Sequence, residues 1–270
     1  MRLSRRLAAL LLLGASVCAA QAPVVPTDHY GPPVCAVAPK AAGRISAAKA
    51  EAIEAAGAAD PTALLSSTPV ENIDIARYRL ADYGACVGSG GCYWADLDAQ
   101  YKRAEGALDR EVALHKRGEK LAIVFDIDET SLSSYCEMQR EDFGYIESMS
   151  NEWVVSPQAA VAIPGALRLF HRAKAAGVDV FFITGRHESQ TAETARNLEA
   201  AGFHGWKGLA LRNAAESSLP TIVYKSGRRK QIVAQGYRII LSIGDQWSDL
   251  NGEPKAEVSV KLPNPFYFLP

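Results

Sequence analysis

The sequence predicts an α/β fold in which a parallel sheet is covered by helices on both faces. Short apolar runs, rich in β-branched and aromatic residues, recur along the second half of the chain. Runs of this kind form strands that are buried on both faces. Segments with helical periodicity separate them, and this alternation of strand and helix is typical of a parallel sheet.

The elements can be placed in order along the chain. The predicted strands are residues 121–125, 178–183, 208–211 and 238–243, with 257–260 as a candidate fifth. Helices are predicted at 45–57, 71–83, 93–117, 164–176, 188–201 and 226–235. The segment 132–162 shows no clear period. We expect it to be an irregular insertion, too short to fold as a separate cap.

The N-terminal residues indicate an exported protein. Residues 1–20 combine basic residues, an apolar core too short to span a bilayer and small residues at the cleavage position, as in a signal peptide. Residues 21–44 are rich in proline and predict an extended arm, so the folded domain would be 45–270. The expected location is therefore secreted or periplasmic. A lipoprotein anchored at Cys18 is a less favoured alternative, because Val17 precedes it.

Four cysteines remain once the signal peptide is removed. An even number in an exported chain favours disulfides, and three pairings are open. Cys86 and Cys92 flank a flexible glycine-rich loop, so this pair is favoured, and Cys35 with Cys136 follows by elimination. Free buried thiols are the alternative.

Composition limits the classes of partner. The chain has 270 residues and a formal net charge of −1, so nothing favours a nucleic-acid polymer as a partner. Outside the signal peptide we expect no membrane span. An anionic ligand would have to be attracted by local charge.

Two carboxylates, Asp126 and Asp128, follow the first predicted strand. The carboxyl ends of strands are where open α/β sheets bind ligands. Two carboxylates placed there repel each other unless a cation is present, and oxygen ligands suit Mg²⁺. The alternative is a strand that ends in a polar turn.

Polar residues also follow three later strands. Thr184 and Gly185 offer a hydroxyl and a backbone N–H in the manner of a phosphate cradle, although Thr184 could equally cap a helix. Lys225 precedes a basic segment whose charges mostly form a solvated face. Asp245 and Asp249 follow the strand at 238–243.

These four sites, in this order, resemble the four motifs of the haloacid dehalogenase (HAD) superfamily of phosphohydrolases. The first is the D-x-D-x-T pattern of 126–130, and the fourth is the G-D-x-x-x-D pattern of 244–249. The strings FFITGR, GDQWSDL and KLPNPFYFLP narrow the resemblance to the acid phosphatases of subfamily IIIB. It implies a HAD-like Rossmannoid fold with a five-stranded parallel sheet and a small insertion after the first strand.

The resemblance also implies the chemistry. Asp126 would be the nucleophile and Asp128 the general acid and base. Thr184, Gly185 and Lys225 would bind the phosphate. Mg²⁺ would be held by the side chains of Asp126 and Asp245 and the backbone carbonyl of Asp128, with Asp249 as a further acidic group of the metal site.

The function implied is a secreted Mg²⁺-dependent acid phosphatase that acts on small phosphomonoesters, with 5′-nucleotides as candidate substrates. Tyr135, Trp153 and Tyr267 are candidate substrate-binding aromatics, with a core position as the alternative for Trp153. Dehalogenation is disfavoured, because displacing a halide needs no general acid at Asp128. A storage-like or binding protein with little activity is the other alternative, and a homodimer is left open.

Overall fold

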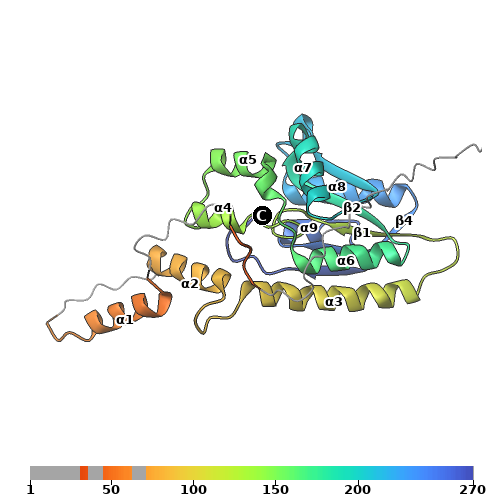
Figure 1. The fold of residues 1–270 in the computed structure, drawn as a ribbon. Helices are drawn as coiled ribbons and strands as arrows, with labels where there is room; N and C mark the ends of the chain where they lie inside the picture. Colours follow the sequence, from red (N-terminus) through yellow and green to blue (C-terminus); the bar gives the residue numbers. More distant parts are fainter. Residues whose placement is uncertain (1–30, 36–44, 63–70, 270) are drawn as a thin grey trace, which may run out of the picture.

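A five-stranded parallel sheet forms the centre of the computed structural model, which describes residues 31–35, 45–62 and 71–269. The strand order is β3-β2-β1-β4-β5, and strands β1, β2 and β4 of the sheet are labelled in Figure 1. The strands are β1 (Lys120–Phe125), β2 (Asp179–His187), β3 (Gly208–Arg212), β4 (Tyr237–Gly244) and β5 (Val258–Lys261). The predicted fold class is confirmed.

Helices cover both faces of the sheet. The helices of the described residues are α1 (Ala47–Ala58), α2 (Ile73–Ala85), α3 (Tyr93–Ala113), α4 (Tyr135–Arg140), α5 (Glu147–Val155), α6 (Pro164–Ala175), α7 (Thr191–Ala200), α8 (Thr221–Ala234) and α9 (Trp247–Leu250), of which α1 and α2 lie away from the sheet (Figure 1). Alternate residues of β1 enter different cores, as the two-residue period of a strand requires. Ile123 and Phe125 pack in the larger core, which includes residues of α3 and α6, and Val124 packs in the smaller core beside α8.

Two expectations about the helices were wrong. The segment predicted to be irregular contains α4 and α5, whose few buried positions are too short a pattern to reveal a period. Helix α8 begins at Thr221, five residues before the predicted start at Ser226. Its first residues, TIVYK, are rich in β-branched and aromatic side chains and read as strand, but the burial of Tyr224 overrides this local preference. Lys225 therefore lies inside the helix and does not precede it.

Both favoured disulfides are present. Cys86–Cys92 closes the turn between α2 and α3, and Cys35–Cys136 ties the N-terminal arm to α4 across a sequence separation of 101. The predicted signal peptide lies outside the described residues, as does most of the arm. In the part of the chain that the structure describes, no helix combines the length and apolar character that crossing a bilayer requires.

The two disulfides should contribute unequally to stability. A cross-link removes more entropy from the unfolded chain when it closes a longer loop, about 2 kcal/mol for the short loop and about 4–5 kcal/mol for the long one. We expect Cys35→Ser/Cys136→Ser to lower the free energy of unfolding by more than Cys86→Ser/Cys92→Ser. Urea denaturation of the two double variants measures this free energy. A larger loss in Cys86→Ser/Cys92→Ser would contradict the expected effect of loop length.

Candidate active site

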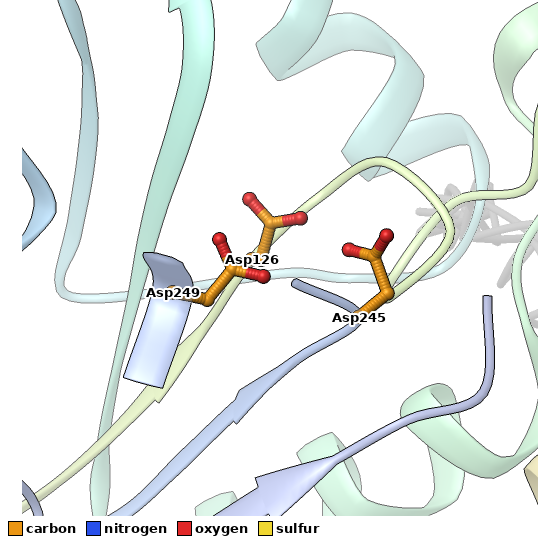
Figure 2. A group of neighbouring side chains, drawn as sticks. All are labelled: Asp126, Asp245 and Asp249. Carbon is orange, nitrogen blue, oxygen red and sulfur yellow. The ribbon is translucent and has the colours of Figure 1, made fainter. Parts of the chain in front are cut away.

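Three buried aspartates meet at the carboxyl edge of the sheet. Asp126 follows β1 and Asp245 follows the neighbouring strand β4, while Asp249 lies in α9 just beyond (Figure 2). One carboxylate oxygen from each lies within 4.8 Å of the others. Because β1 and β4 are parallel neighbours, their ends bring together residues that are 119 positions apart (245 − 126).

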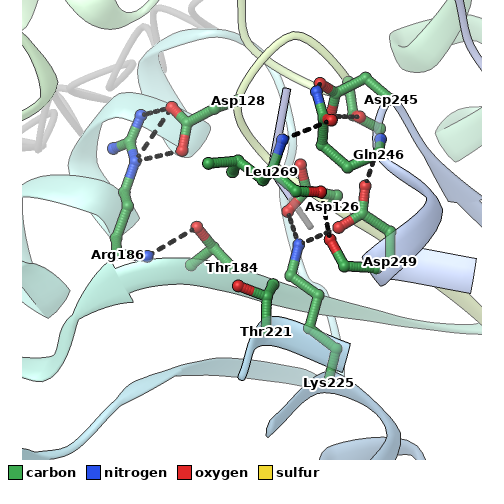
Figure 3. Close-up of polar contacts among 12 residues, drawn as sticks. Asp126, Asp128, Thr184, Arg186, Thr221, Lys225, Asp245, Gln246, Asp249 and Leu269 are labelled. Carbon is green, nitrogen blue, oxygen red and sulfur yellow. Dashed lines mark hydrogen bonds and ion pairs between the residues drawn. The ribbon is translucent and has the colours of Figure 1, made fainter. Parts of the chain in front are cut away.

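Lys225 of α8 lies between two of these carboxylates. Its Nζ is 2.5 Å from Asp126 Oδ1 and 2.5 Å from Asp249 Oδ1 (Figure 3). The other oxygen of Asp249 accepts the backbone N–H of Gln246 at 2.8 Å. Gly244 lies under Asp249, and a Cβ at this position would overlap the Asp249 side chain. A side chain at this position would therefore push Asp249 away from Lys225.

The charges of the cluster do not balance within the described residues. Three buried carboxylates face one ammonium, and burial together with the neighbouring carboxylates raises the pKa of Asp126 well above its usual range, although Lys225 opposes the shift. Burial acts against the Lys225 ammonium, but Asp126 and Asp249 outweigh it and raise its pKa. A divalent cation would supply the missing positive charge, and an all-oxygen donor set suits Mg²⁺. The residues present therefore fit a divalent metal.

Asp245 is oriented by neutral donors. Its Oδ2 accepts hydrogen bonds from Asn264 Nδ2 at 2.6 Å and Gln246 Nε2 at 2.7 Å, and its Oδ1 accepts one from Thr130 Oγ1 at 3.2 Å. Sequence reasoning gave none of these three a role. Gln246 occupies a variable position of the fourth motif, and Asn264 lies in the C-terminal string that supported the resemblance.

The side chain of Asp128 points away from the aspartate cluster. Its carboxylate forms an ion pair with Arg186, whose Nη2 lies 2.7 Å and Nε 3.1–3.2 Å from its oxygens (Figure 3). Arg186 is buried and also donates to the backbone oxygen of Val154 and to Thr194 Oγ1. Burial acts against its charge, but Asp128 outweighs this and raises the pKa of Arg186. Arg186 is thus part of the site.

Thr184, part of the predicted phosphate cradle, lies between the aspartate cluster and the Asp128–Arg186 ion pair (Figure 3). Thr184 is inside β2, which continues to His187, and its Oγ1 accepts the backbone N–H of Arg186 at 3.2 Å. Gly185 lines the cavity, and the space beside its Cα is open. Thr184 therefore does not cap a helix, and it lies on the same side of the site as Lys225 (Figure 3).

The turn that carries the first motif is strained and braced. Glu129 has φ +52°, which a non-glycine residue adopts at a cost of about 1–3 kcal/mol. Its buried carboxylate accepts the backbone N–H and hydroxyl of Ser134, both at 2.6 Å, and the hydroxyl of Tyr267 at 2.7 Å. Burial raises the pKa of Glu129 to about 7. These contacts link the turn to the C-terminal segment.

A cavity of about 730 Å³ opens over the aspartates. Its other walls include apolar side chains from the insertion and from the C-terminal segment: Met138, Phe143, Trp153, Phe266 and Tyr267. Trp153 and Tyr267, two of the candidate substrate-binding aromatics, thus line the cavity. Tyr135 does not line this cavity. It is fully buried and packs against Trp94, and its hydroxyl accepts Gln139 Nε2, so its predicted role as a substrate contact is corrected to a core role.

Comparison with known proteins agrees with this geometry. Residues 46–270 match the model of the HAD superfamily, subfamily IIIB (acid phosphatase). The chain belongs to this family. The family predicted from the four motifs is confirmed, and so is the phosphomonoesterase class that it implies.

The similar proteins of this subfamily include an enzyme and storage proteins. Acid phosphatase 1 of Solanum lycopersicum is 36% identical over 191 residues, which are 70% of this chain and 74% of the relative. Vegetative storage protein 1 of Arabidopsis thaliana is 31% identical over 180 residues, 63% of this chain and 66% of the relative. The fold matches a class C acid phosphatase from Bacillus anthracis, crystallised with tungstate, with a TM-score of 0.55 and 24% identity over 71% of this chain and 86% of that one.

Replacing Lys225 should destabilise the metal-free protein. Lys225→Met leaves Asp126 and Asp249 buried without their cation, and breaking a buried ion pair in this way costs about 3–5 kcal/mol. Lys230→Met is the matched control, because Lys230 is an exposed lysine of the same helix and its loss should cost less than about 0.5 kcal/mol. Urea denaturation in the presence of a chelator measures both. If both variants lost the same free energy of unfolding, the stabilising role of the Lys225 ion pairs would be contradicted.

Proposed function

We propose that this protein is a secreted, Mg²⁺-dependent acid phosphatase that hydrolyses small phosphomonoesters through an aspartyl phosphate. The observation that carries the proposal is the cluster of Asp126, Asp245 and Asp249 around Lys225 at the base of an open cavity. Family membership supports the reaction class. The two disulfides support an oxidising location such as the periplasm or the extracellular space.

The metal would be held by the carboxylates of Asp126 and Asp245 and the backbone carbonyl of Asp128. Asp249, whose two oxygens already accept Lys225 and the Gln246 N–H, would act from the outer side of the site. When bound, Mg²⁺ would neutralise the carboxylates and the phosphate oxygens and so stabilise the charge of the transition state.

The protein side chains would then divide the reaction between them. A carboxylate oxygen of Asp126 attacks phosphorus as the bond to the ester oxygen breaks, and Asp128 donates a proton to the departing alcohol. Water then attacks the aspartyl phosphate while Asp128 takes its proton, which releases inorganic phosphate and restores Asp126. Arg186 would hold the Asp128 carboxylate in place through its two-point contact.

The phosphoryl oxygens would be bound by three groups. Thr184 supplies a hydroxyl, Gly185 a backbone N–H and Lys225 an ammonium whose charge offsets that of the nucleophile and the phosphate. Lys225 contacts Asp126 directly and Thr184 lies on the same side of the site (Figure 3), while Gly185 lines the cavity, and these positions support the assignment.

A storage role with little turnover is the second candidate. Vegetative storage proteins of Arabidopsis thaliana and stem glycoproteins of Glycine max are among the similar sequences. Against this candidate, the chain retains every acidic and basic residue that the reaction above requires, and Lys225 contacts two of them directly.

A turnover assay with p-nitrophenyl phosphate separates the candidates. We expect release of inorganic phosphate at acidic pH that is lost after treatment with a chelator and restored by adding Mg²⁺. A protein with no turnover under any metal would be the storage-like alternative, and turnover that resists chelation would contradict the metal assignment.

Replacing each of the two carboxylates of the first motif should affect turnover in a different way. Asp126→Asn removes the attacking oxygen, so turnover should fall to background with every substrate. Asp128→Asn removes only the proton donor, and general acid–base assistance is worth about 10²- to 10⁴-fold. The loss in kcat for Asp128→Asn should be smaller with p-nitrophenyl phosphate, whose leaving group needs little protonation, than with an alkyl phosphate. Identical losses with both substrates would contradict the assignment of Asp128.

Trp153 tests whether aromatic leaving groups such as nucleosides are bound by stacking. Stacking on one base is worth about 1–3 kcal/mol, so Trp153→Ala should raise KM for nucleoside monophosphates roughly tenfold or more. KM for methyl phosphate should change much less, because it has no ring to stack. Small, equal effects on both substrates would assign Trp153 to the core, where it also contacts Cys136 and Ala159.

A further inference from the structure

The part of the cavity wall that comes from the insertion has a distinct chemistry. This wall, formed by residues 134–154 and called the insertion wall below, includes α4 and α5. It contributes two carboxylates, Glu137 and Glu141, to the cavity. No lysine, arginine or histidine of this segment lines the cavity, because its one such residue, Arg140, lies outside the lining. The cationic lining residues come from β2, β3 and α8.

Glu137 stands out within the insertion wall. The residue is 2% exposed, and neither of its carboxylate oxygens accepts a hydrogen bond from the described residues. Arg140 Nε lies 3.3 Å from Oε2 without hydrogen-bond geometry. Leaving a buried carboxylate without donors is costly, and such a group is expected to meet a partner. Burial raises the pKa of Glu137, against the opposing charge of Arg140, as expected for an anion short of donors.

The other glutamates on the cavity are already satisfied. Glu141 accepts the backbone N–H of Ile146 at 3.2 Å and the hydroxyl of Ser150 at 3.2 Å. Glu129 accepts Ser134 and Tyr267. Of the cavity's three glutamates, Glu137 is therefore the one whose carboxylate oxygens accept no hydrogen bond from the described residues.

Aromatic rings border the same wall. Phe143, Tyr145 and Trp153 belong to it, and Phe266 lies 5.6 Å from the Phe143 ring, centroid to centroid. A cation near an aromatic face is attracted by the ring quadrupole, and more strongly when it is desolvated. A buried carboxylate that accepts no hydrogen bond from the described residues, beside aromatic rings, is thus complementary to an organic ammonium, which offers charge and N–H donors together.

We propose that the insertion wall binds a positively charged leaving group, so that the preferred substrates are phosphate esters of amino alcohols. This inference rests on the proposed phosphatase function. In the bound substrate the phosphate lies at Lys225 and the metal ligands, and the ammonium lies at Glu137. A neutral alkyl alcohol would leave the Glu137 carboxylate unsatisfied, whereas an ammonium donates to it.

Matched substrates test the proposal. kcat/KM is measured by phosphate release for n-alkyl phosphates and for ω-aminoalkyl phosphates of the same length, from ethyl to hexyl. At the length that spans the cavity, the wild-type protein should prefer the aminoalkyl ester by about tenfold or more, which corresponds to about 1.4 kcal/mol. The absence of any preference at every length would overturn the proposal.

Two variants test whether Glu137 causes the preference for aminoalkyl esters. In Glu137→Gln the ratio of aminoalkyl to alkyl kcat/KM should fall about tenfold. Glu152→Gln is the control, because Glu152 is an exposed carboxylate of α5 that acts on the pKa of Glu137 but does not line the cavity. Its ratio should be unchanged. Comparing ratios between variants cancels the intrinsic reactivity of each ester. An unchanged ratio in Glu137→Gln, or an equal fall in Glu152→Gln, would overturn the assignment.

A measurement on the wild-type protein covers the case in which Glu137→Gln does not fold. Amino alcohols should inhibit p-nitrophenyl phosphate hydrolysis at concentrations about tenfold lower than n-alcohols of the same length, and equal inhibition would overturn the proposal.

The proposed phosphatase function and the proposed binding of a cationic leaving group are tested by different outcomes. If no ester released phosphate, the proposed function would fall, whereas release without a charge preference would overturn only the binding of a cationic leaving group.

Discussion

The ion pairs that Lys225 makes with Asp126 and Asp249 are the interaction on which the site depends. The parallel pairing of β1 and β4 brings Asp126 and Asp245 to one edge of the sheet, and α9 adds Asp249. Such a group of buried carboxylates repels itself. One ammonium from α8 reduces this repulsion without cancelling it, and the remaining negative charge suits the site to a cation. The same charge imbalance thus links the cost in stability to the proposed function.

The surrounding contacts fix where each carboxylate points. Gly244 leaves room for Asp249, and Asn264 and Gln246 saturate one oxygen of Asp245. Arg186 turns the side chain of Asp128 to the opposite side of the site. The proposed nucleophile, Asp126, and the proposed proton donor, Asp128, are therefore two residues apart in sequence but have different partners. This difference in surroundings allows two like residues to take different parts in one reaction.

The sheet and the four motifs could be predicted because their signals are local. A buried strand followed by a carboxylate or a hydroxyl is recognised from a few consecutive residues. Asp126 and Asp245 directly follow such strands, and Thr184 lies within β2 near its end. Cys86–Cys92 could be predicted for the same reason, because a short loop joins the pair.

Contacts between distant segments could not be predicted from short stretches of the sequence. The bond from Asn264 to Asp245 and the bond from Tyr267 to Glu129 form because the C-terminal segment returns to the cavity. The direction of an aromatic side chain is equally non-local, so Tyr135 was expected in the cavity but lies in the core. The place of Arg186 in the site likewise depends on its contact with Asp128, a residue 58 positions away in sequence.

The central claim is that Asp126 is the nucleophile, and covalent trapping tests it most directly. In Asp128→Asn, water attack loses its base, so the phosphoryl-enzyme should accumulate during turnover. Reaction with hydroxylamine or borohydride, followed by peptide mass spectrometry, should place the modification on Asp126. Modification of any other residue, or near-normal turnover by Asp126→Asn, would contradict the account.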